Sequence, residues 1–278
     1  MPQPQTLYAL CWYFYLYSFL GWCAEVAFAA CKTRQLVNRG FLNGPVCPIY
    51  GFGMLAAVTA LGPVRGSLPA LFFGGALLAT ALELVGGWAL KTLFHARWWD
   101  YSDKPFNLGG YICLRFSLLW GVGVAAVMRL LHPAVELLVG RLLTNLPGAV
   151  LLGVCTGMFA ADLIVTLITV TGLIRQLGEL ERLTALLHKS SDLLTKQVGG
   201  AALAADERIS AGREKLEGRT GAARAELEMR RDLLRAGILD RQLGAQRLLR
   251  AFPTLKSSRY EDALRTLRQE LAERLRRR

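Results

Sequence analysis

Four ionisable side chains interrupt otherwise apolar stretches of this sequence. Glu25, Glu83, Arg115 and Asp162 each lie in, or at the edge of, a segment long enough to cross a membrane. A charge at the bilayer centre costs at least about 2.5–3.5 kcal/mol, so such residues tend to face a protein interior or a wet cavity. Paired carboxylates can also perform acid–base chemistry when their neighbours shift their pKa values. These residues are therefore the first candidates for a functional site.

Two loops contain most of the other unusual residues. Residues 38–53 are rich in Gly, Pro and Asn, which favour shaped turns and close backbone approach. Residues 97–110 place Asp100 beside two tryptophans and a tyrosine, side chains that favour the headgroup level of a membrane. The predicted binding site combines these loops with the intramembrane charges: Glu25, Asn38, Arg39, Asn43, Tyr50, Glu83, Trp99, Asp100, Tyr101, Asn107 and Arg115.

Helical spacing suggests how the two glutamates approach each other. Glu25 shares a helical face with Ser18 and Trp22, and Glu83 shares one with Thr80 and Gly87. Small residues let helices approach closely, so these faces could pack and direct both carboxylates at one space, with Arg115 as the counter-charge. A purely structural role stays open, in which the charges lock the helices together and extend to the interface.

The elements that must position these residues are membrane-spanning helices. Apolar residues make up 53% of the 278 residues. Residues 1–174 carry only 10 basic and 6 acidic side chains, whereas residues 175–278 carry 23 and 15. A transmembrane helix needs about 20 apolar residues, and five segments qualify or come close: 7–30, 45–61, 68–90, 111–131 and 146–174. We predict an all-α membrane bundle over 1–174, with 132–145 as an interfacial helix, followed by a cytoplasmic basic tail over 175–278.

Loop charges predict the orientation of this bundle. With the N-terminus outside, six basic residues fall in inner loops and three in outer loops, and Arg175 and Arg182 follow the last span on the inner side. This arrangement places the C-terminus in the cytoplasm. It also puts Glu25, Glu83, Arg115 and both loops at about one depth near the cytoplasmic face of a multi-pass plasma-membrane protein.

Several strings of rare residues occur together in the first half of the chain. They include SFLGW at 18–22 with Glu25, NRGFLNGP at 38–45, PIYG at 48–51, Glu83 and WWDYS at 98–102. In this order they resemble the ABC-transporter type IV (CmpB-like) membrane protein family, and RAFP at 250–253 extends the likeness into the tail. The resemblance implies a permease-like membrane protein but brings no ligand or reaction. The chain has no Walker A motif, so an ATPase, if used, would be a separate subunit.

Catalytic and metal-binding motifs are not evident. The six cysteines form no C-x-x-C pair and only three histidines are present, so we expect free thiols, no metal site and no cofactor. We expect a transport-related protein with a polar, cytoplasm-facing site rather than an enzyme. An intramembrane enzyme with Glu25 or Glu83 as its base remains an alternative.

The tail supports a further alternative, a membrane-anchored scaffold. Leu173, Leu177, Leu180, Leu183 and Leu187 predict that the last span continues into an amphipathic cytoplasmic helix. A helical hairpin or coiled coil, folded on itself or on a second copy of the chain, is the simplest structure for this region. Its basic residues suit anionic membrane lipid. No nucleic-acid partner is expected, because 15 acidic residues are interleaved and no recognition motif occurs.

Overall fold

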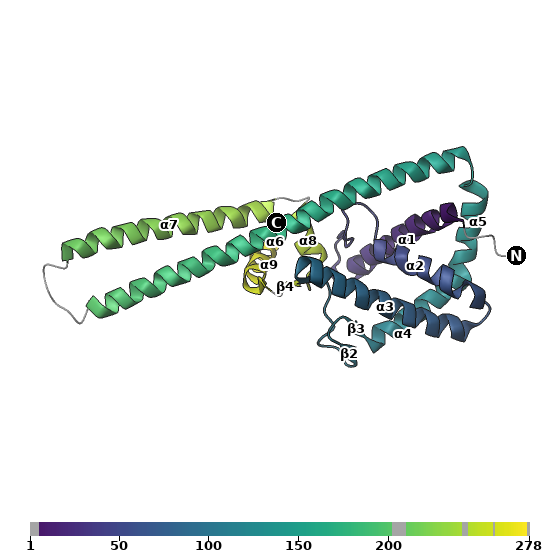
Figure 1. The fold of residues 1–278 in the computed structure, drawn as a ribbon, viewed down its shortest axis with the longest axis horizontal. Helices are drawn as coiled ribbons and strands as arrows, with labels where there is room; N and C mark the ends of the chain where they lie inside the picture. Colours follow the sequence, from purple (N-terminus) through teal and green to yellow (C-terminus); the bar gives the residue numbers. More distant parts are fainter. Residues whose placement is uncertain (1–5, 202–209, 241–243, 258, 277–278) are drawn as a thin grey trace. The chain divides into compact units, whose positions relative to one another are not determined.

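The computed structural model describes residues 6–201, 210–240, 244–257 and 259–276, which are largely helical (Figure 1). Its contacts divide the chain into two compact units. The first contains Met1–Thr169 and Arg247–Lys256, and the second contains Val170–Gln246 and Ser257–Arg278. The division into a transmembrane domain over 1–174 and a cytoplasmic tail over 175–278 stays a prediction.

Two long helices of the first unit carry the two glutamates. They are α1 (Leu7–Thr33) and α3 (Leu68–Phe94). Each begins after a hydroxyl side chain, Thr6 or Ser67, that accepts a hydrogen bond from the backbone N–H three residues later. Such caps satisfy an N–H group that has no partner within the helix. The two helices therefore begin where their own sequence provides a cap.

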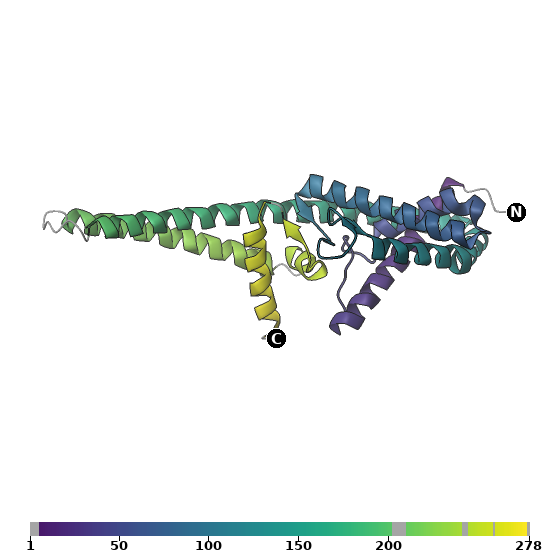
Figure 2. The same cartoon turned by 90° about the horizontal axis from the view of Figure 1, so that it is seen from below.

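A shorter apolar helix, α2 (Pro48–Leu61), contacts both α1 and α3 (Figure 2). Its proline opens the first turn, where the missing N–H has no helical partner to lose. Close approach to α1 depends on two glycines. A Cβ atom on Gly21 would overlap the ring of Tyr50, and one on Gly51 would overlap Ser18. This tight contact places Tyr50 against the helix that carries Glu25.

The next helix is longer than the sequence indicates. α4 (Leu114–Ala126) continues through a π-helical turn, η2 (Val127–Leu131), directly into α5 (His132–Leu142). The segment expected over 132–145 is therefore not a separate helix, whereas its interfacial position stays a prediction. Pro133 interrupts the α-helical hydrogen-bond pattern, and the π turn just before it lets the helix continue across that point.

Among the described residues, four helices are long and apolar enough to cross a membrane: Leu7–Thr33, Leu68–Phe94, Leu114–Arg141 and Leu146–Lys189. Pro48–Val64 is a shorter apolar helix. Lipid-facing apolar side chains explain the many exposed hydrophobic residues on these helices. The all-α membrane bundle is confirmed, whereas the five spans and their orientation stay predictions.

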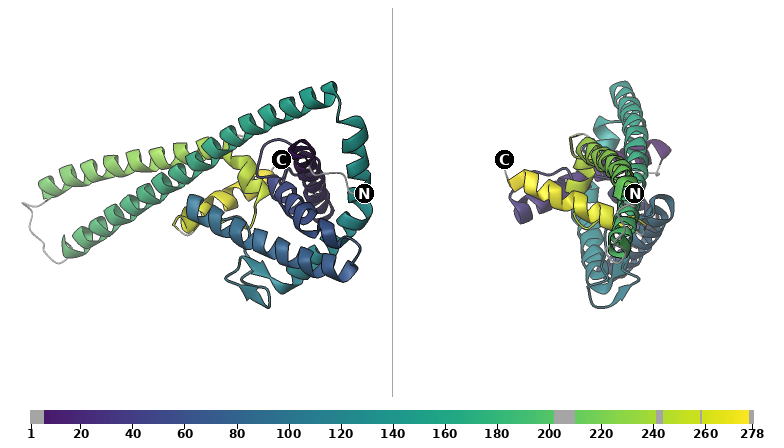
Figure 3. Two further views of the ribbon diagram at one scale, coloured as in Figure 1. Left: turned by 45° about the vertical axis from the view of Figure 1, so that its right-hand side comes forward. Right: turned by 90° about the vertical axis from the view of Figure 1, so that its left-hand side faces the viewer.

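Short irregular elements connect these helices. They are η1 (Gly62–Val64), β1 (Ala96–Arg97), β2 (Asn107–Leu108) and β3 (Ile112–Cys113). β2 and β3 pair antiparallel, with Asn107 opposite Cys113, and this small hairpin leads into α4 (Figure 3). Because β3 ends where α4 begins, the loop after α3 is attached to both helices.

The remaining elements are α6 (Leu146–Ala201), α7 (Ser210–Asp240), α8 (Ala245–Ala251), β4 (Lys256–Ser257) and α9 (Glu261–Arg276). α6 runs through residue 174 without a break, which confirms the predicted extension of the last apolar helix. The predicted face Leu173, Leu177, Leu180, Leu183 and Leu187 is buried. Three leucines of α9, Leu264, Leu267 and Leu271, are buried as well. The second unit thus has its own apolar core.

Candidate functional site

Glu25, near the end of α1, has one polar partner from α2 and one from the loop that follows α1. The hydroxyl of Tyr50 donates a hydrogen bond to Glu25 Oε1 at 2.8 Å. Arg39 Nε lies 3.5 Å from Glu25 Oε2, and both side chains are 28% exposed. Glu25 is therefore a half-buried carboxylate with a cation beside it.

Glu83, on α3, is bound differently. The residue is only 8% exposed, and its Oε1 accepts hydrogen bonds from Trp120 Nε1 at 3.0 Å and from the hydroxyl of Tyr101 at 3.5 Å. Within the described part of the chain, no group donates to its buried Oε2 and no cation lies within ion-pair distance. Its neighbours are neutral donors, and its buried Oε2 has no donor among the described residues.

Aromatic rings connect the two glutamates. The rings of Tyr50 and Trp120 meet edge to face, with centroids 5.7 Å apart. Since Tyr50 donates to Glu25 and Trp120 donates to Glu83, both carboxylates belong to one chain of contacts. We call the six residues of this chain the two-glutamate cluster: Glu25, Arg39, Tyr50, Glu83, Tyr101 and Trp120.

The sequence prediction missed Trp120 and gave Arg115 a role that it does not have. Arg115 is exposed, and no ion pair joins it to Glu25 or Glu83 in the described part of the chain, so the expected counter-charge is wrong. Arg39 takes that place at Glu25. No local sequence signal marked Trp120. Ser117, three residues earlier, bonds Thr80 on α3 at 2.7 Å, so this face of α4 is turned toward α3.

The loop after α1 is held by its own asparagines. Asn38 Oδ1 accepts from Trp22 Nε1 at 2.8 Å and from the backbone N–H of Gly40 at 2.9 Å. Its Nδ2 donates to the carbonyl of Asn43 at 2.7 Å. These bonds close the loop over 38–44 into one fixed shape, which places Arg39 beside Glu25.

Asp162, an intramembrane charge that the predicted site did not include, anchors the same loop. Its Oδ1 accepts from the backbone and side-chain nitrogens of Asn43 at 3.0 and 2.9 Å, and its Oδ2 accepts from the N–H of Gly44 at 2.7 Å. Thr166 donates to Oδ1 as well, at 3.3 Å. Four donors thus surround this carboxylate, which explains how α6 tolerates it.

Three of the predicted site residues in the second loop make hydrogen bonds that hold the loop itself. Trp99 Nε1 donates to the carbonyl of Tyr111 at 2.9 Å, and Asn107 bonds backbone groups of its own turn. Asp100 accepts from Ser102 and from Lys256 Nζ, the latter at 2.6 Å. Burial alone would raise the pKa of Asp100, but these bonds lower it to about 2. Trp99, Asp100 and Asn107 therefore shape the loop rather than join the cluster.

Tyr101 is the member of this loop that reaches the cluster. Its ring stacks on Phe116 of α4, with centroids 4.9 Å apart, and its hydroxyl points to Glu83. Burial and the neighbouring Glu83 raise the pKa of Tyr101. The hydroxyl therefore keeps its proton near neutral pH and can act as a donor.

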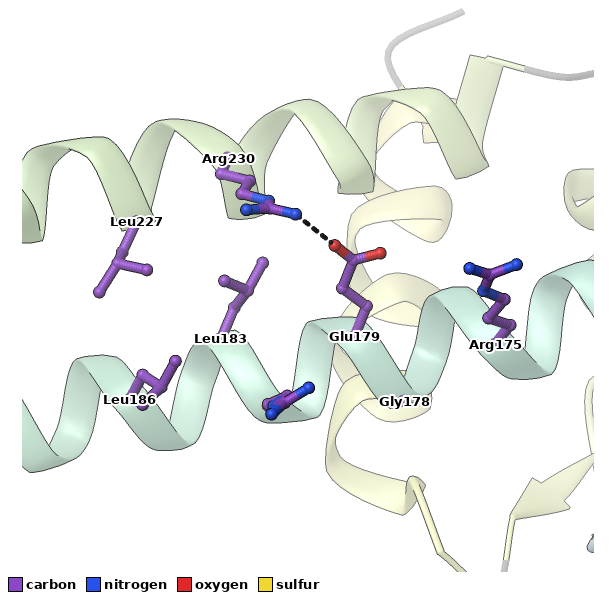
Figure 4. A pocket seen from close by; sticks show the side chains of 8 residues that line it. Arg175, Gly178, Glu179, Leu183, Leu186, Leu227 and Arg230 are labelled. Atoms are coloured by element: carbon purple, nitrogen blue, oxygen red, sulfur yellow. Dashed lines mark hydrogen bonds and ion pairs between the residues drawn. The ribbon is translucent and has the colours of Figure 1, made fainter.

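The second unit contains a cleft between α6 and α7 of about 540 Å³ (Figure 4). Leu183, Leu186 and Leu227 form its apolar part. Its charged residues are Arg175, Arg182, Arg230 and Glu179, and Arg230 pairs with Glu179 across the cleft at 3.1 Å. The lining therefore combines apolar surface with an excess of positive charge.

Comparison with known proteins identifies the family of the first unit. In the described part of the chain, no group of three His, Cys, Asp or Glu side chains could hold a metal ion. No curated protein and no solved structure matches the chain. A family model described as "Putative ABC-transporter type IV" matches residues 12–167, a stretch that contains the whole two-glutamate cluster. Since this match covers more than half of the sequence, the chain belongs to the ABC-transporter type IV family of membrane proteins.

Proposed function

We propose that the two-glutamate cluster is the ligand site of a multi-pass plasma-membrane transport protein. The observation that carries the proposal is the buried Oε2 of Glu83, to which no described residue donates a hydrogen bond. Leaving a buried acceptor unpaired costs about 1–3 kcal/mol, and more for a charged group. A ligand that donates to this oxygen would recover that energy, so the site favours binding.

The surroundings of Glu83 favour a cationic ligand. The cluster contains two carboxylates, and among the described residues only Glu25 has a cation beside it. The rings of Tyr50 and Trp120 lie between them, and aromatic faces attract ammonium groups. We therefore expect a small inorganic or organic cation rather than an anion.

The proposed access route is from the cytoplasm. Asn38 and Asp100 belong to loops that the positive-inside pattern assigns to the inner face, and both loops supply a member of the cluster, Arg39 and Tyr101. Any ATP-driven step would need a separate ATPase subunit, because this sequence contains no nucleotide-binding motif.

The experiment is thermal unfolding of the purified protein in detergent, with sodium, potassium, ammonium or choline chloride at constant ionic strength. Binding to the folded state raises the unfolding temperature, with a stabilisation of about 2.7 kcal/mol at 100 times Kd. We expect a saturable rise with at least one cation, lost in Glu83→Gln. Arg115→Gln is the matched control, since Arg115 is exposed and outside the cluster, and should keep the rise.

Two results would overturn this proposal. One is the lack of a saturable rise with each of the four cations. The other is a rise of equal size in Glu83→Gln and the unchanged protein, which would place binding elsewhere. A positive result leads to a second test, uptake of the same cation into proteoliposomes.

The cleft between α6 and α7 supports a second candidate, a membrane-anchored scaffold whose tail binds anionic lipid. Arg175, Arg182 and Arg230 line it together with leucines, a combination that suits an acidic headgroup and part of an acyl chain. Native mass spectrometry after reconstitution in mixed phosphatidylglycerol and phosphatidylcholine should show retained phosphatidylglycerol. Replacing the three arginines with Gln should abolish that retention, and equal retention would remove this candidate.

A further inference from the structure

A segment from near the end of the chain is part of the first unit. Residues Arg247–Lys256 belong with Met1–Thr169, although about 80 residues separate them in sequence. Four apolar residues of this segment are nearly inaccessible to solvent: Leu248, Leu249, Ala251 and Leu255 are between 0% and 4% exposed. The segment is therefore packed in place and does not merely follow the second unit.

Arg247 binds the loop that follows α1. Its two terminal nitrogens donate to the carbonyls of Gly40 and Phe41, both at 2.9 Å. A guanidinium group can bridge two neighbouring acceptors in this way because its donors form a rigid fork. Gly40 directly follows Arg39, the residue beside Glu25. Arg247 thus holds the backbone next to Arg39, a member of the two-glutamate cluster.

Lys256 binds the other loop. Its ammonium group lies 2.6 Å from Asp100 Oδ2. Asp100 directly precedes Tyr101, whose hydroxyl points to Glu83. The contact between Lys256 and Asp100 therefore lies next to Tyr101, another member of the cluster.

Between these two charged contacts, an aromatic group joins both loops to the segment. The ring of Phe252 meets Trp98 edge to face at 4.8 Å, and Trp98 meets Phe41 at 5.0 Å. Thr254 also donates to the carbonyl of Trp98 at 3.4 Å. The segment contacts both loops along most of its length.

We propose that residues 247–256 form a strap that completes the site, with Arg247 and Lys256 as its positioning residues. Arg247 holds Arg39 against Glu25 through the backbone of Gly40, and Lys256 holds Tyr101 against Glu83 through Asp100. Release of the strap frees both loops at once. The effect on ligand binding rests on the proposed function, whereas the strap itself does not.

The test uses full-length protein with Leu248→Cys as the only cysteine, labelled by a maleimide. Leu248 is 1% exposed, so labelling is slow while the strap is in place. We expect at least tenfold faster labelling in Arg247→Ala and in Asp100→Lys. Arg97 Nη1 lies 3.9 Å from Asp100 Oδ1 and would repel a lysine there, so the double variant Asp100→Lys/Lys256→Asp is made in an Arg97→Gln background. It restores the ion pair with reversed charges and should label slowly again. Arg250→Ala, an exposed arginine of the same segment, is the matched control and should label slowly.

Unchanged labelling in both Arg247→Ala and Asp100→Lys would overturn the strap, as would a charge-reversed pair that stays fast. Arg247→Lys keeps the positive charge but removes the two-donor geometry, because one ammonium group cannot bridge the two carbonyls as the guanidinium does. It should label nearly as fast as Arg247→Ala, and slow labelling would contradict the positioning role.

The link to the cluster is measured with the cation that stabilises the unchanged protein. Its apparent Kd should rise at least tenfold in Arg247→Ala and recover in the charge-reversed pair relative to Asp100→Lys. An unaltered Kd in variants that label fast would overturn the positioning role and leave the strap standing. Failure of all four cations would contradict the proposed function, while the labelling result would still decide the strap.

Discussion

The first unit contains two kinds of carboxylate, and they differ in how fully their oxygens are satisfied. Asp162, on α6, accepts from four donors, and Asp100, in the loop after α3, accepts from Ser102 and Lys256. In the helix interior, Glu83 accepts two bonds on one oxygen, and no described residue donates to the other. Glu25 lies between these cases, with one hydrogen bond and one longer ion pair.

This difference separates structural from functional candidates. A buried carboxylate with every acceptor paired has reached its best arrangement, and a ligand could only disturb it. A buried carboxylate oxygen without a donor costs free energy, and a bound ligand that donates a hydrogen bond to it can reduce that cost. We therefore infer that Asp162 and Asp100 hold the loops in place, whereas Glu83 is the candidate to bind a ligand.

The largest effect is expected for Asp162→Asn. The amide replaces an acceptor with a donor, so it opposes either Gly44 N–H or the two Asn43 nitrogens. We expect the free energy of unfolding to fall by about 3 kcal/mol, the upper end for hydrogen bonds to a charged group, because Asp162 is half-buried and accepts four of them. Unfolding by SDS titration in mixed micelles measures this. Thr166→Val, which removes one weaker donor, is the control. A cost below about 1 kcal/mol would show that Asp162 does not anchor the loop.

A smaller loss is expected when Glu83 loses its nearer donor. Trp120→Phe removes the 3.0 Å bond to Oε1 and leaves a buried carboxylate with a single distant donor. The expected cost is about 2 kcal/mol, in the range for hydrogen bonds to charged groups. Tyr101→Phe removes the longer bond, at 3.5 Å, and should cost less in the same titration. The reverse order would mean that Tyr101 is the main donor.

Glu83→Gln should change stability by less than about 1 kcal/mol in either direction. The amide keeps an acceptor for Trp120 and Tyr101, and no described cation loses a partner. Comparing this small cost with the large one for Asp162→Asn measures directly the difference between a carboxylate with paired oxygens and one with an unpaired oxygen. Equal costs for the two substitutions would mean that Glu83 is also a structural anchor.

The smallest effect concerns pH and Asp100. Because the folded pKa of this carboxyl is lowered to about 2, its stabilising contribution is fully present above the unfolded value of about 3.9 and is lost as pH falls through the folded value. Because a maleimide reacts with the thiolate, the labelling rate of Leu248→Cys is compared at each pH with that of the same variant unfolded in SDS. This ratio should not change as the pH is lowered toward 4. The unfolding temperature should lose the Asp100 contribution progressively between about pH 4 and pH 2, by comparison with Asp100→Asn. A strap that opens near pH 5 would contradict this pairing.

Much of the cluster could be predicted from local sequence. Glu25, Arg39, Tyr50, Glu83 and Tyr101 stand out because they are polar or aromatic in or beside apolar segments, and the structure brings these five into one chain of contacts. Trp120 could not be singled out, because a tryptophan in an apolar helix fits equally well against lipid. Its role depends on the rotation of α4 against α3, which small groups such as Ser117 and Thr80 decide.

Two pairings lay beyond any local pattern. Arg39 and Arg115 are both near Glu25 in predicted membrane depth, and only the fold of the loop over 38–44 places Arg39 beside it. Arg247 lies more than 200 residues from the carbonyls that it binds. Sequence spacing predicts neighbours on one helix, but it does not specify which distant segments share a contact.

By itself, the sequence determined a membrane-embedded all-α unit, an apolar helix that extends past residue 174, and most of the polar and aromatic positions of the candidate site. Hydropathy and helical periodicity are local, and the bilayer requires long helices that satisfy their own backbone groups. Only the tertiary structure decided which carboxylate is saturated, which keeps an open oxygen, and that residues 247–256 return to hold both loops. Those outcomes depend on side-chain packing between segments far apart in the chain, for which no local pattern exists.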